Sequence, residues 1–368
     1  MSLQAKSLFV AMELSNKKWK LGFGDGSRER ERTIPARNGT ALMQEIEVAK
    51  AKMGLASDAP VICGYEAGRD GFWIARMLKT QGVKVYVMDP ASIKVSRQAR
   101  KKKTDRLDVK KLLQALIHRE LWGEQESFSE VRVPSEAQEA DLRLHRERER
   151  LVGERTGHQT RIRSLLALHG IIIKSPARVV LESLRDWEGK PLSPAWLDEL
   201  RHEQQRLLAV KERIDEIEKE QIAALNDPQT PAVVKASKLH RLKAVGIQSA
   251  WTLSMECFGW RRFQNRKQVG SFAGLTGTPF ASGDTTREQG ISKAGNRRVR
   301  RVMIELAWSW VRWQPESALT HWFIDRYIRG ADSRSRRKGI VALARKLLVA
   351  LWKYVEQDIM PEGAMVRA

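Results

Sequence analysis

The sequence predicts an α/β domain followed by a mostly helical remainder. Short apolar segments with strand-like alternation are concentrated near the N-terminus, ahead of Pro90. From Glu136 onward, charged helix-forming residues dominate, with apolar residues three or four positions apart. Hydrophobic residues make up 42% of the 368 residues, which is ordinary for a globular protein. The chain is therefore long enough to build two or three domains with cores of their own.

The first segment alternates strands and helices in a defined order. Ser7–Leu14 and Trp19–Gly24 are apolar strands, and Arg28–Pro35 alternates in charge as an edge strand would. A helix, a strand, a helix and a strand follow, which is the order of an RNase H-type domain. We expect this domain to span residues 1–125. The four later elements are Gly39–Lys52, Pro60–Gly64, Gly71–Gln81 and Val83–Met88.

Residues 126–231 are expected to form a helical middle region. Proline and glycine residues within Ile171–Pro194 indicate a connector between two long helices. Further along, apolar residues repeat with the spacing of a helical seam, which fits a hairpin coiled coil or a plain helical spacer. The residues of that seam are Leu207, Val210, Ile214 and Ile217.

Residues 232–368 are expected to form a mostly helical C-terminal domain. A glycine-rich stretch, Gly270–Gly295, interrupts its helices. Trp308, Trp310 and Trp313 follow at helical spacing. This spacing favours packing in a core over stacking on unpaired bases.

The charge balance indicates a polyanionic partner. The chain has 66 Lys and Arg residues against 44 Asp and Glu residues, a formal net charge of +22. Such a surplus favours nucleic acid, because basic contacts to phosphates release bound counterions. A basic protein without this partner is the weaker interpretation. The dense clusters Arg97–Arg106 and Arg326–Lys338 fit a surface that follows a nucleic-acid backbone, although a solvated charge run has the same composition.

Membrane insertion and zinc binding are both disfavoured. The best candidate for a membrane span, Gly339–Trp352, is interrupted by Arg345 and Lys346. Cys63 and Cys257 have no spacing typical of zinc ligands. We therefore expect a cytoplasmic protein with no membrane partner, in which any catalytic metal is a hard ion held by carboxylates.

Four acidic residues occupy positions suited to divalent cations. Glu13 lies inside an apolar strand, where an unpaired charge would be costly. Glu66 follows the PVICG strand by two residues, and Asp105 and Asp108 begin a helix with both side chains on one face. Together they can hold paired Mg²⁺ ions, with Mn²⁺ as the alternative, for phosphoryl transfer. Taken singly, Glu66 also fits an exposed loop and Asp105 a favourable helix N-terminus.

The segments that contain these acids resemble those of a known family. Phe9–Ser15, Cys63–Gly68 and Lys103–Lys111 are similar to the acidic motifs of the DEDD transposases, the bridge-RNA-guided recombinases of the insertion-sequence one-ten family. Phe272–Arg300 and Gly339–Leu348 resemble that family's second signature and its closing helix. The resemblance implies a RuvC-like fold for the first domain. The family usually has Asp at the first acidic position, where this chain has the longer Glu.

The resemblance implies that Ser282 attacks a DNA phosphodiester and forms a transient phosphoserine link, with the four acids completing the catalytic site. No histidine lies near Ser282 in the sequence, so activation by a carboxylate-bound metal is the consistent mechanism. A guide RNA would pair with donor and target DNA. The residues expected to contact nucleic acid are Gly283, Arg287, Lys293, Arg297, Arg298 and Arg300 near the serine, and Arg97, Arg100, Lys101, Lys102, Lys103 and Arg106 in the basic loop.

Two other functions are compatible with these residues. A RuvC-like nuclease would hydrolyse DNA junctions with water, and Ser282 would then be a turn residue before a glycine. A non-catalytic scaffold would bind nucleic acid with a metal site weakened by Glu13. Because strand exchange joins two duplexes, the recombinase interpretation also predicts a homodimer, joined through Leu207–Ile217, that forms a tetramer in synapsis. Its place of action would be the bacterial nucleoid.

Overall fold

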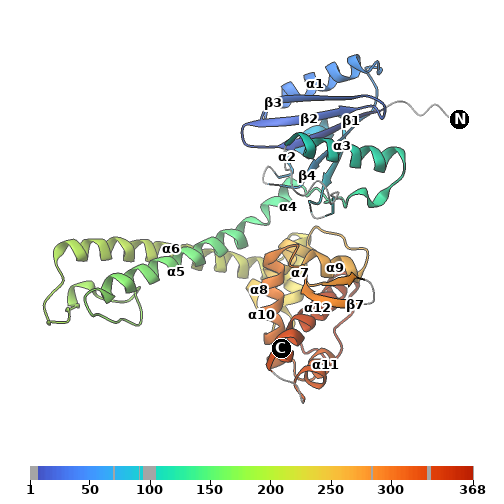
Figure 1. The fold of residues 1–368 in the computed structure, drawn as a ribbon. Coiled ribbons are helices and arrows are strands. Elements are labelled where there is room, and N and C mark those ends of the chain that lie inside the picture. The colour runs from blue at the N-terminus through green and yellow to red at the C-terminus, as the bar shows by residue number, and fades with distance from the viewer. Residues whose placement is uncertain are drawn as a thin grey trace. The chain divides into compact units, whose positions relative to one another are not determined.

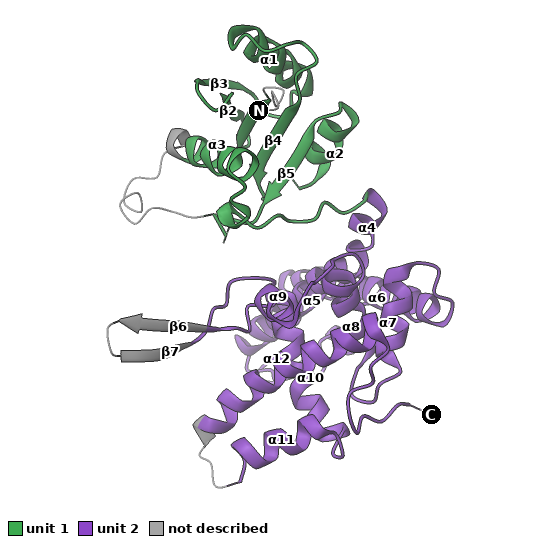
Figure 2. Cartoon of the chain, turned by 90° about the vertical axis from the view of Figure 1, so that its right-hand side faces the viewer, with its two compact units in different colours: residues 1–135 green, residues 136–368 purple. Residues whose placement is uncertain are grey.

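The computed structural model describes residues 7–68, 71–90, 92–93, 105–282, 285–329 and 333–367. Within them, residues 105–107, 278–282, 285–289 and 333–334 are described by their backbone alone. Contacts divide the chain into two compact units, Met1–Ser135 and Glu136–Ala368, coloured green and purple in Figure 2. Among the described residues, no helix is both long and apolar enough to cross a lipid bilayer.

The first unit is a mixed α/β fold, and its elements occur in the order that the sequence predicts. A basic segment separates the last strand from the last helix, as expected. The three-domain division of the chain stays a prediction. The strands are β1 (Leu8–Leu14), β2 (Lys18–Gly24), β3 (Glu29–Pro35), β4 (Val61–Glu66) and β5 (Lys84–Met88), and the helices are α1 (Gly39–Lys52), α2 (Trp73–Thr80) and α3 (Asp105–Leu121).

The five strands form one sheet with the order β3-β2-β1-β4-β5 (Figure 1). The β1–β2 and β2–β3 pairs are antiparallel, whereas β1–β4 and β4–β5 are parallel. Neighbouring residues along a strand point to opposite faces, so the two faces bury different side chains. Val10 and Met12 of β1 pack in a core with α1 and α2, while Phe9 and Ala11 pack in a core with α3.

Glycines allow α3 to lie close to the sheet. A Cβ at Gly22 would meet Val109 Cγ1 at 3.3 Å, and a Cβ at Gly24 would meet Ile117 Cδ1 at 3.3 Å. The residues of α3 therefore follow the same direction as the β2 residues they cover. Since β1 is antiparallel to β2, the first turn of α3 lies toward the end of β1 that carries Glu13.

The second unit begins with α4 (Glu136–Ala140) and two long helices, α5 (Arg143–Ala167) and α6 (Pro194–Asn226), that lie side by side (Figure 1). The predicted pair of long helices joined by a connector is confirmed. Ile214 and Ile217 of the predicted seam are buried between the helices. A coiled-coil supertwist stays a prediction. Short 3₁₀ helices lie at Gln125–Ser127 in the first unit and at Leu181–Ser183 in the connector.

The rest of the second unit is mostly helical, as predicted, and the described residues form one large core and a smaller one beside the end of α6. A two-stranded antiparallel hairpin occupies the glycine-rich stretch, where the sequence did not predict strands. The elements are α7 (Pro231–His240), α8 (Ile247–Leu253), the π-helical turn η4 (Ser254–Phe258), α9 (Arg266–Phe272), β6 (Gly277–Ser282), β7 (Thr285–Ile291), α10 (Arg297–Trp313), α11 (Ala318–Tyr327) and α12 (Ser333–Gln357).

The three tryptophans of α10 have different environments. Trp310 is fully buried, as core packing predicts, but Trp308 and Trp313 are 39% and 54% exposed. The Arg336 guanidinium lies 5.1 Å from the centre of the Trp308 ring. The core-packing prediction is therefore correct for Trp310 and wrong for the other two, because helical spacing alone does not fix how far a buried stripe extends around the helix.

Candidate catalytic site and its supporting network

Glu13 and Glu66 lie at the same level on two adjacent parallel strands. The register pairs Met12 of β1 with Tyr65 of β4, so the next residue on each strand is one of the two acids. Glu66 is the last residue of β4 and pairs with Met88 of β5, whereas the sequence placed it beyond the strand. Adjacent strands are about 4.8 Å apart. The two carboxylates therefore leave the same edge of the sheet as neighbours.

Both acids emerge on the face that α3 covers. Met12 and Tyr65 belong to the core on the opposite face of the sheet. Met88, which is level with Glu66, belongs to the core under α3. Because side chains alternate between faces, Glu13 and Glu66 both point to the α3 side. Each is partly exposed.

The first turn of α3 supplies the other two acids. Asp105 begins the helix and is described by its backbone alone, and Asp108 follows one turn later. Lys111 Nζ lies 3.3 Å from Asp108 Oδ1. Among the side chains that the structure describes, which exclude that of Asp105, no three His, Cys, Asp or Glu residues gather as a metal site. The four-carboxylate site stays a prediction.

Lys20 lies opposite Glu13 across the β1–β2 pair. Directly opposed residues on antiparallel strands point to the same face, so Lys20 also lies on the α3 side. Its Nζ is 3.4 Å from Glu31 Oε2, and its side chain is 22% exposed. The sequence did not single out Lys20. Only the register between the two strands brings it beside the acidic edge.

Ser282 is the last residue of β6 and pairs with Thr285, the first residue of β7. Two residues separate them, so Ser282 lies beside the tip of the hairpin. The structure describes the backbone of Ser282 but not its side chain, and Gly283 lies outside the described residues. The hydroxyl therefore has no described partners, and the catalytic role of Ser282 stays a prediction.

The base of the hairpin is a close crossing of two loops. The Lys293 amide donates to the Gly274 carbonyl at 3.2 Å. Gly274 and Gly295 have positive φ values of 65° and 119°. A Cβ at Gly274 would clash with the Ala294 carbonyl oxygen, and a Cβ at Gly295 would clash with the Phe272 carbonyl oxygen. Glycine at both positions is what allows the two backbones to touch.

Arg300 holds this crossing together. Its Nη1 donates to the Ala273 carbonyl at 3.2 Å and to the Lys293 carbonyl at 2.8 Å. The guanidinium thus satisfies main-chain oxygens from both loops. The sequence assigned Arg300 to nucleic-acid contact, which stays a prediction beside this structural role.

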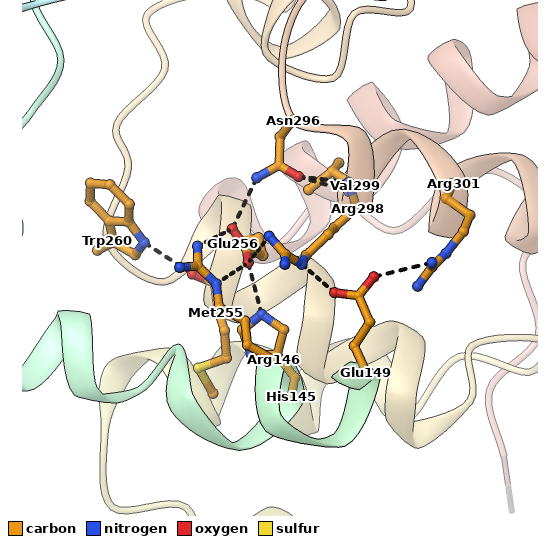
Figure 3. Close-up of polar contacts among 10 residues, drawn as sticks. All are labelled: His145, Arg146, Glu149, Met255, Glu256, Trp260, Asn296, Arg298, Val299 and Arg301. Atoms are coloured by element: carbon orange, nitrogen blue, oxygen red, sulfur yellow. Dashed lines mark hydrogen bonds and ion pairs between the residues drawn. The ribbon is translucent and has the colours of Figure 1, made fainter. Parts of the chain in front are cut away.

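A buried carboxylate, Glu256, links the crossing to α5. Glu256 is 3% exposed within the π-helical turn. Its Oε1 accepts hydrogen bonds from His145 Nε2 at 2.9 Å and Arg146 Nε at 2.8 Å. Its Oε2 accepts from Arg146 Nη2 at 3.1 Å and from Asn296 Nδ2 at 2.9 Å (Figure 3). No local pattern marks Glu256, because its partners lie far away in the sequence.

The surroundings of Glu256 keep it ionised. Burial alone would raise the pKa of the Glu256 carboxyl, but hydrogen bonds from His145 and Arg146 and the charge of Arg146 outweigh burial. The pKa therefore lies well below the ordinary value of 4.5. A carboxylate that is both buried and charged requires all of these donors to stay in place.

A second ion-pair group joins α5 to α10. Glu149 accepts a hydrogen bond from Arg298 Nε and lies 3.1 Å from Arg301 Nη1 (Figure 3). Arg298, a predicted nucleic-acid contact, is therefore also part of the packing between these helices. By contrast, Lys293 and Arg297 are exposed, as a contact to a phosphate requires.

The other predicted nucleic-acid contacts have side chains that the structure does not describe. Arg106 belongs to α3 and Arg287 to β7, and only their backbones are described. Their contacts with nucleic acid stay predictions. The predicted contacts that fall wholly outside the described residues are Arg97, Arg100, Lys101, Lys102, Lys103 and Gly283.

Two family models match this chain. The model described as the transposase IS116/IS110/IS902 family matches residues 236–321, which contain the hairpin and the π-helical turn. A DEDD transposase model named for IS110 matches residues 29–171. That second range contains three of the four predicted acids, and Glu13 precedes it.

Three similar proteins are also described as transposases, and each matches most of this chain. The putative transposase y4rJ of Sinorhizobium fredii is 37% identical over 98% of this chain and 95% of its own length. The putative transposase y4qE of the same bacterium is 26% identical over 78% of this chain and 73% of its own length. The transposase for insertion sequence element IS1328 of Yersinia enterocolitica is 24% identical over 86% of this chain and 90% of its own length.

Proposed function

The chain belongs to the IS116/IS110/IS902 family of transposases, and from that premise we propose how it acts on DNA. A transposase cleaves and rejoins DNA, so the chain is an enzyme of strand cleavage and joining. We propose that Ser282 is the nucleophile, that the acids of the first unit hold divalent cations, and that a guide RNA selects the donor and target DNA.

One observation supports the metal site above all others: Glu13 and Glu66 are level neighbours on one face of the sheet. Neighbouring carboxylates repel each other, and a divalent cation bound by both would offset this repulsion. The first turn of α3, which carries Asp105 and Asp108, lies toward the same edge. We therefore propose that the four acids hold a hard divalent ion, Mg²⁺ or Mn²⁺. When bound, such an ion offsets negative charge on the phosphate oxygens and favours an ionised nucleophile.

The serine step conserves the number of phosphodiester links. Ser282 Oγ forms a bond to the scissile phosphorus while the bond from phosphorus to one strand-end oxygen breaks. The hydroxyl proton ends on that departing oxygen. Because one ester replaces another, a second strand end can attack the phosphoserine and rejoin the DNA without an energy source. Hydrolysis by water would lose this link, so a serine suits an enzyme that must rejoin what it cuts.

Exposed basic residues of the second unit support the nucleic-acid partners. Lys293 and Arg297 are exposed near the base of the hairpin that carries Ser282. The net charge of +22 favours contacts with several phosphates at once. In the proposed complex the RNA selects sequence by pairing, and these side chains hold backbones. Exchange between two duplexes would use a dimer that pairs into a tetramer.

Trapping of a covalent adduct tests this function. The full chain is co-expressed with the DNA that flanks its gene, purified with the RNA it retains, and given that DNA with Mg²⁺. We expect wild-type protein to give nicked DNA and a protein–DNA adduct on denaturing gels. Ser282→Ala should give neither, and a chelator should abolish both. Ser292→Ala, an exposed serine beyond the other end of the hairpin, serves as the matched control and should behave like wild type.

The outcomes separate the candidate functions. Nicked DNA from wild type without any adduct would identify a nuclease that uses water. Cleavage by Ser282→Ala would exclude this serine as the nucleophile. Full activity of Asp108→Ala would contradict the proposed metal site. Absence of all cleavage in Mg²⁺ and Mn²⁺ would favour a non-catalytic scaffold.

A further inference from the structure

Asn296 is the point where three parts of the second unit meet. Its Oδ1 accepts from the amides of Arg298 at 2.9 Å and Val299 at 3.1 Å, which caps the N-terminus of α10. Its main-chain N–H donates to the Phe272 carbonyl at 2.7 Å, at the loop crossing. Its Nδ2 donates to Glu256 Oε2 at 2.9 Å (Figure 3). The same residue therefore ties together a helix end, the hairpin base and a buried charge.

The segment that precedes Asn296 leaves it little freedom. Gly295 lies against the Phe272 carbonyl and has a positive φ, and Lys293 has a φ of 56°. The Lys293 amide and carbonyl are both bonded across the crossing, to Gly274 and Arg300. Strand β7 ends at Ile291, two residues before Lys293. A shift of Asn296 is thus carried directly into the hairpin, whose first strand ends at Ser282.

Glu256 connects this position to α5. His145 and Arg146 are in the first turn of α5, three and four residues into a helix that begins at Arg143, and both donate to Glu256. The carboxylate is therefore the common acceptor for α5 and for the hairpin base. Because it is charged and almost fully buried, a partner that moves away leaves an uncompensated charge. The energetic cost of such a movement keeps the parts in one arrangement.

We propose that the Glu256–Asn296 hydrogen bond positions the hairpin for strand cleavage. It holds the base of β6 and β7 against α5, and so sets where the hairpin tip presents its nucleophile. The proposal rests on the proposed function in that Ser282 makes the attack. Displacement of a reacting group by about 1 Å can cost on the order of 10²-fold in rate. Neither residue touches the reacting atoms, so both are positioning residues.

An Asn296→Asp substitution isolates this hydrogen bond. The aspartate keeps the oxygen that caps α10, where a negative charge is also favourable. It replaces the donor to Glu256 with a second carboxylate, so the contact becomes repulsive. We expect the rate of nicking to fall on the order of 10- to 100-fold, with affinity for the flanking DNA within about threefold of wild type. Asn265→Asp is the matched control, because Asn265 caps α9 through the amides of Lys267 and Gln268.

A swap of donor and acceptor tests the pair itself. In the double variant Glu256→Gln with Asn296→Asp, the glutamine Nε2 takes the place of Oε2 and can donate to the new aspartate, which restores the hydrogen bond with its direction reversed. The glutamine oxygen still accepts from His145 and from Arg146 Nε, and only the hydrogen bond from Arg146 Nη2 is lost. We expect the double variant to nick DNA at least about fivefold faster than Asn296→Asp alone, as coupled residues do in a double-mutant cycle. A loss of general stability would not be repaired in this way, because Glu256→Gln removes a charge that His145 and Arg146 also use.

Each result decides the proposal. Slow nicking with retained binding, repaired by the swap, supports it. Nicking at the wild-type rate by Asn296→Asp overturns it, and so does a double variant no faster than the single one. Equal losses of binding and nicking also overturn it, since they indicate misfolding of the unit. If wild-type protein nicks DNA without an adduct, the serine mechanism fails, whereas the rates of the variants still decide the positioning role.

Discussion

Glu256 is a charge inside a protein interior, and such a charge persists only where hydrogen bonds offset the loss of water. Its four donors come from His145, Arg146 and Asn296, on α5 and at the start of α10. Arg298 Nη1 lies 3.9 Å from Oε1 and adds positive charge. The single carboxylate therefore accepts hydrogen bonds from several donors that would otherwise be unsatisfied. These donors belong to segments that are far apart in the sequence.

The ionised state of Glu256 predicts a dependence of stability on pH. The folded-state pKa lies below the ordinary value of 4.5, so the unfolded chain binds more protons at this residue in acid. The stabilising contribution of Glu256 is fully present above that ordinary value and is lost as the pH falls through the lower folded pKa. The measurement is the free energy of unfolding of wild type and of Glu256→Gln as a function of pH.

We expect the advantage of wild type over Glu256→Gln to be constant from neutrality down to weak acid and to shrink in stronger acid. Glu154→Gln is the control, because Glu154 is a partly exposed residue of α5 paired with Arg150. Its difference from wild type should be small at every pH. A wild-type advantage that grows in acid would show that the sign of the pKa shift is wrong.

At the scale of elements, the π-helical turn is fixed by its contact with α7. A Cβ at Gly259 would lie 2.7 Å from Ala232 Cβ and 3.0 Å from the Ser254 carbonyl oxygen. Neither atom is at the end of a flexible side chain. The Gly259→Ala substitution should therefore push α7 away from the turn that holds Glu256, and destabilise the protein by about 1–3 kcal/mol.

Chemical denaturation of Gly259→Ala measures this cost, and a compensating change tests its origin. Adding Ala232→Gly removes the nearest atom and should recover part of the lost stability despite the lower helix propensity of glycine. Gly157→Ala, in α5 where the new Cβ would meet nothing within 4 Å, should instead be neutral or stabilising. An additive double variant would mean that the two helices do not meet as described.

Elements with a clear period could be predicted from the sequence, and contacts between distant segments could not. The strands of the first unit alternate apolar and polar residues or are continuously apolar, which is a local signal. The β6–β7 hairpin was missed because glycine and threonine residues also suit a loop. Lys20 and Glu256 were missed for a different reason. Their importance comes from strand register and from hydrogen bonds to segments that only the fold brings together.

At the scale of the whole molecule, the residues proposed for one reaction are divided between the two units. The acids belong to Met1–Ser135, and Ser282 belongs to Glu136–Ala368. Either unit alone would therefore lack part of the chemistry.

Binding of nucleic acid should depend steeply on salt because contacts to phosphates release counterions. For duplex DNA, each neutralised phosphate contributes about −0.9 to the slope of log affinity against log salt concentration. Replacing Arg97, Arg100, Lys101, Lys102 and Lys103 with glutamine should make the slope less steep by up to about 4.5. Arg201→Gln with Arg206→Gln is the control, because both arginines are paired with acidic neighbours on α6. Its slope should match that of wild type. Titration of labelled duplex at several salt concentrations gives the slopes, and an unchanged slope for the variant with all five substitutions would exclude these residues as phosphate contacts.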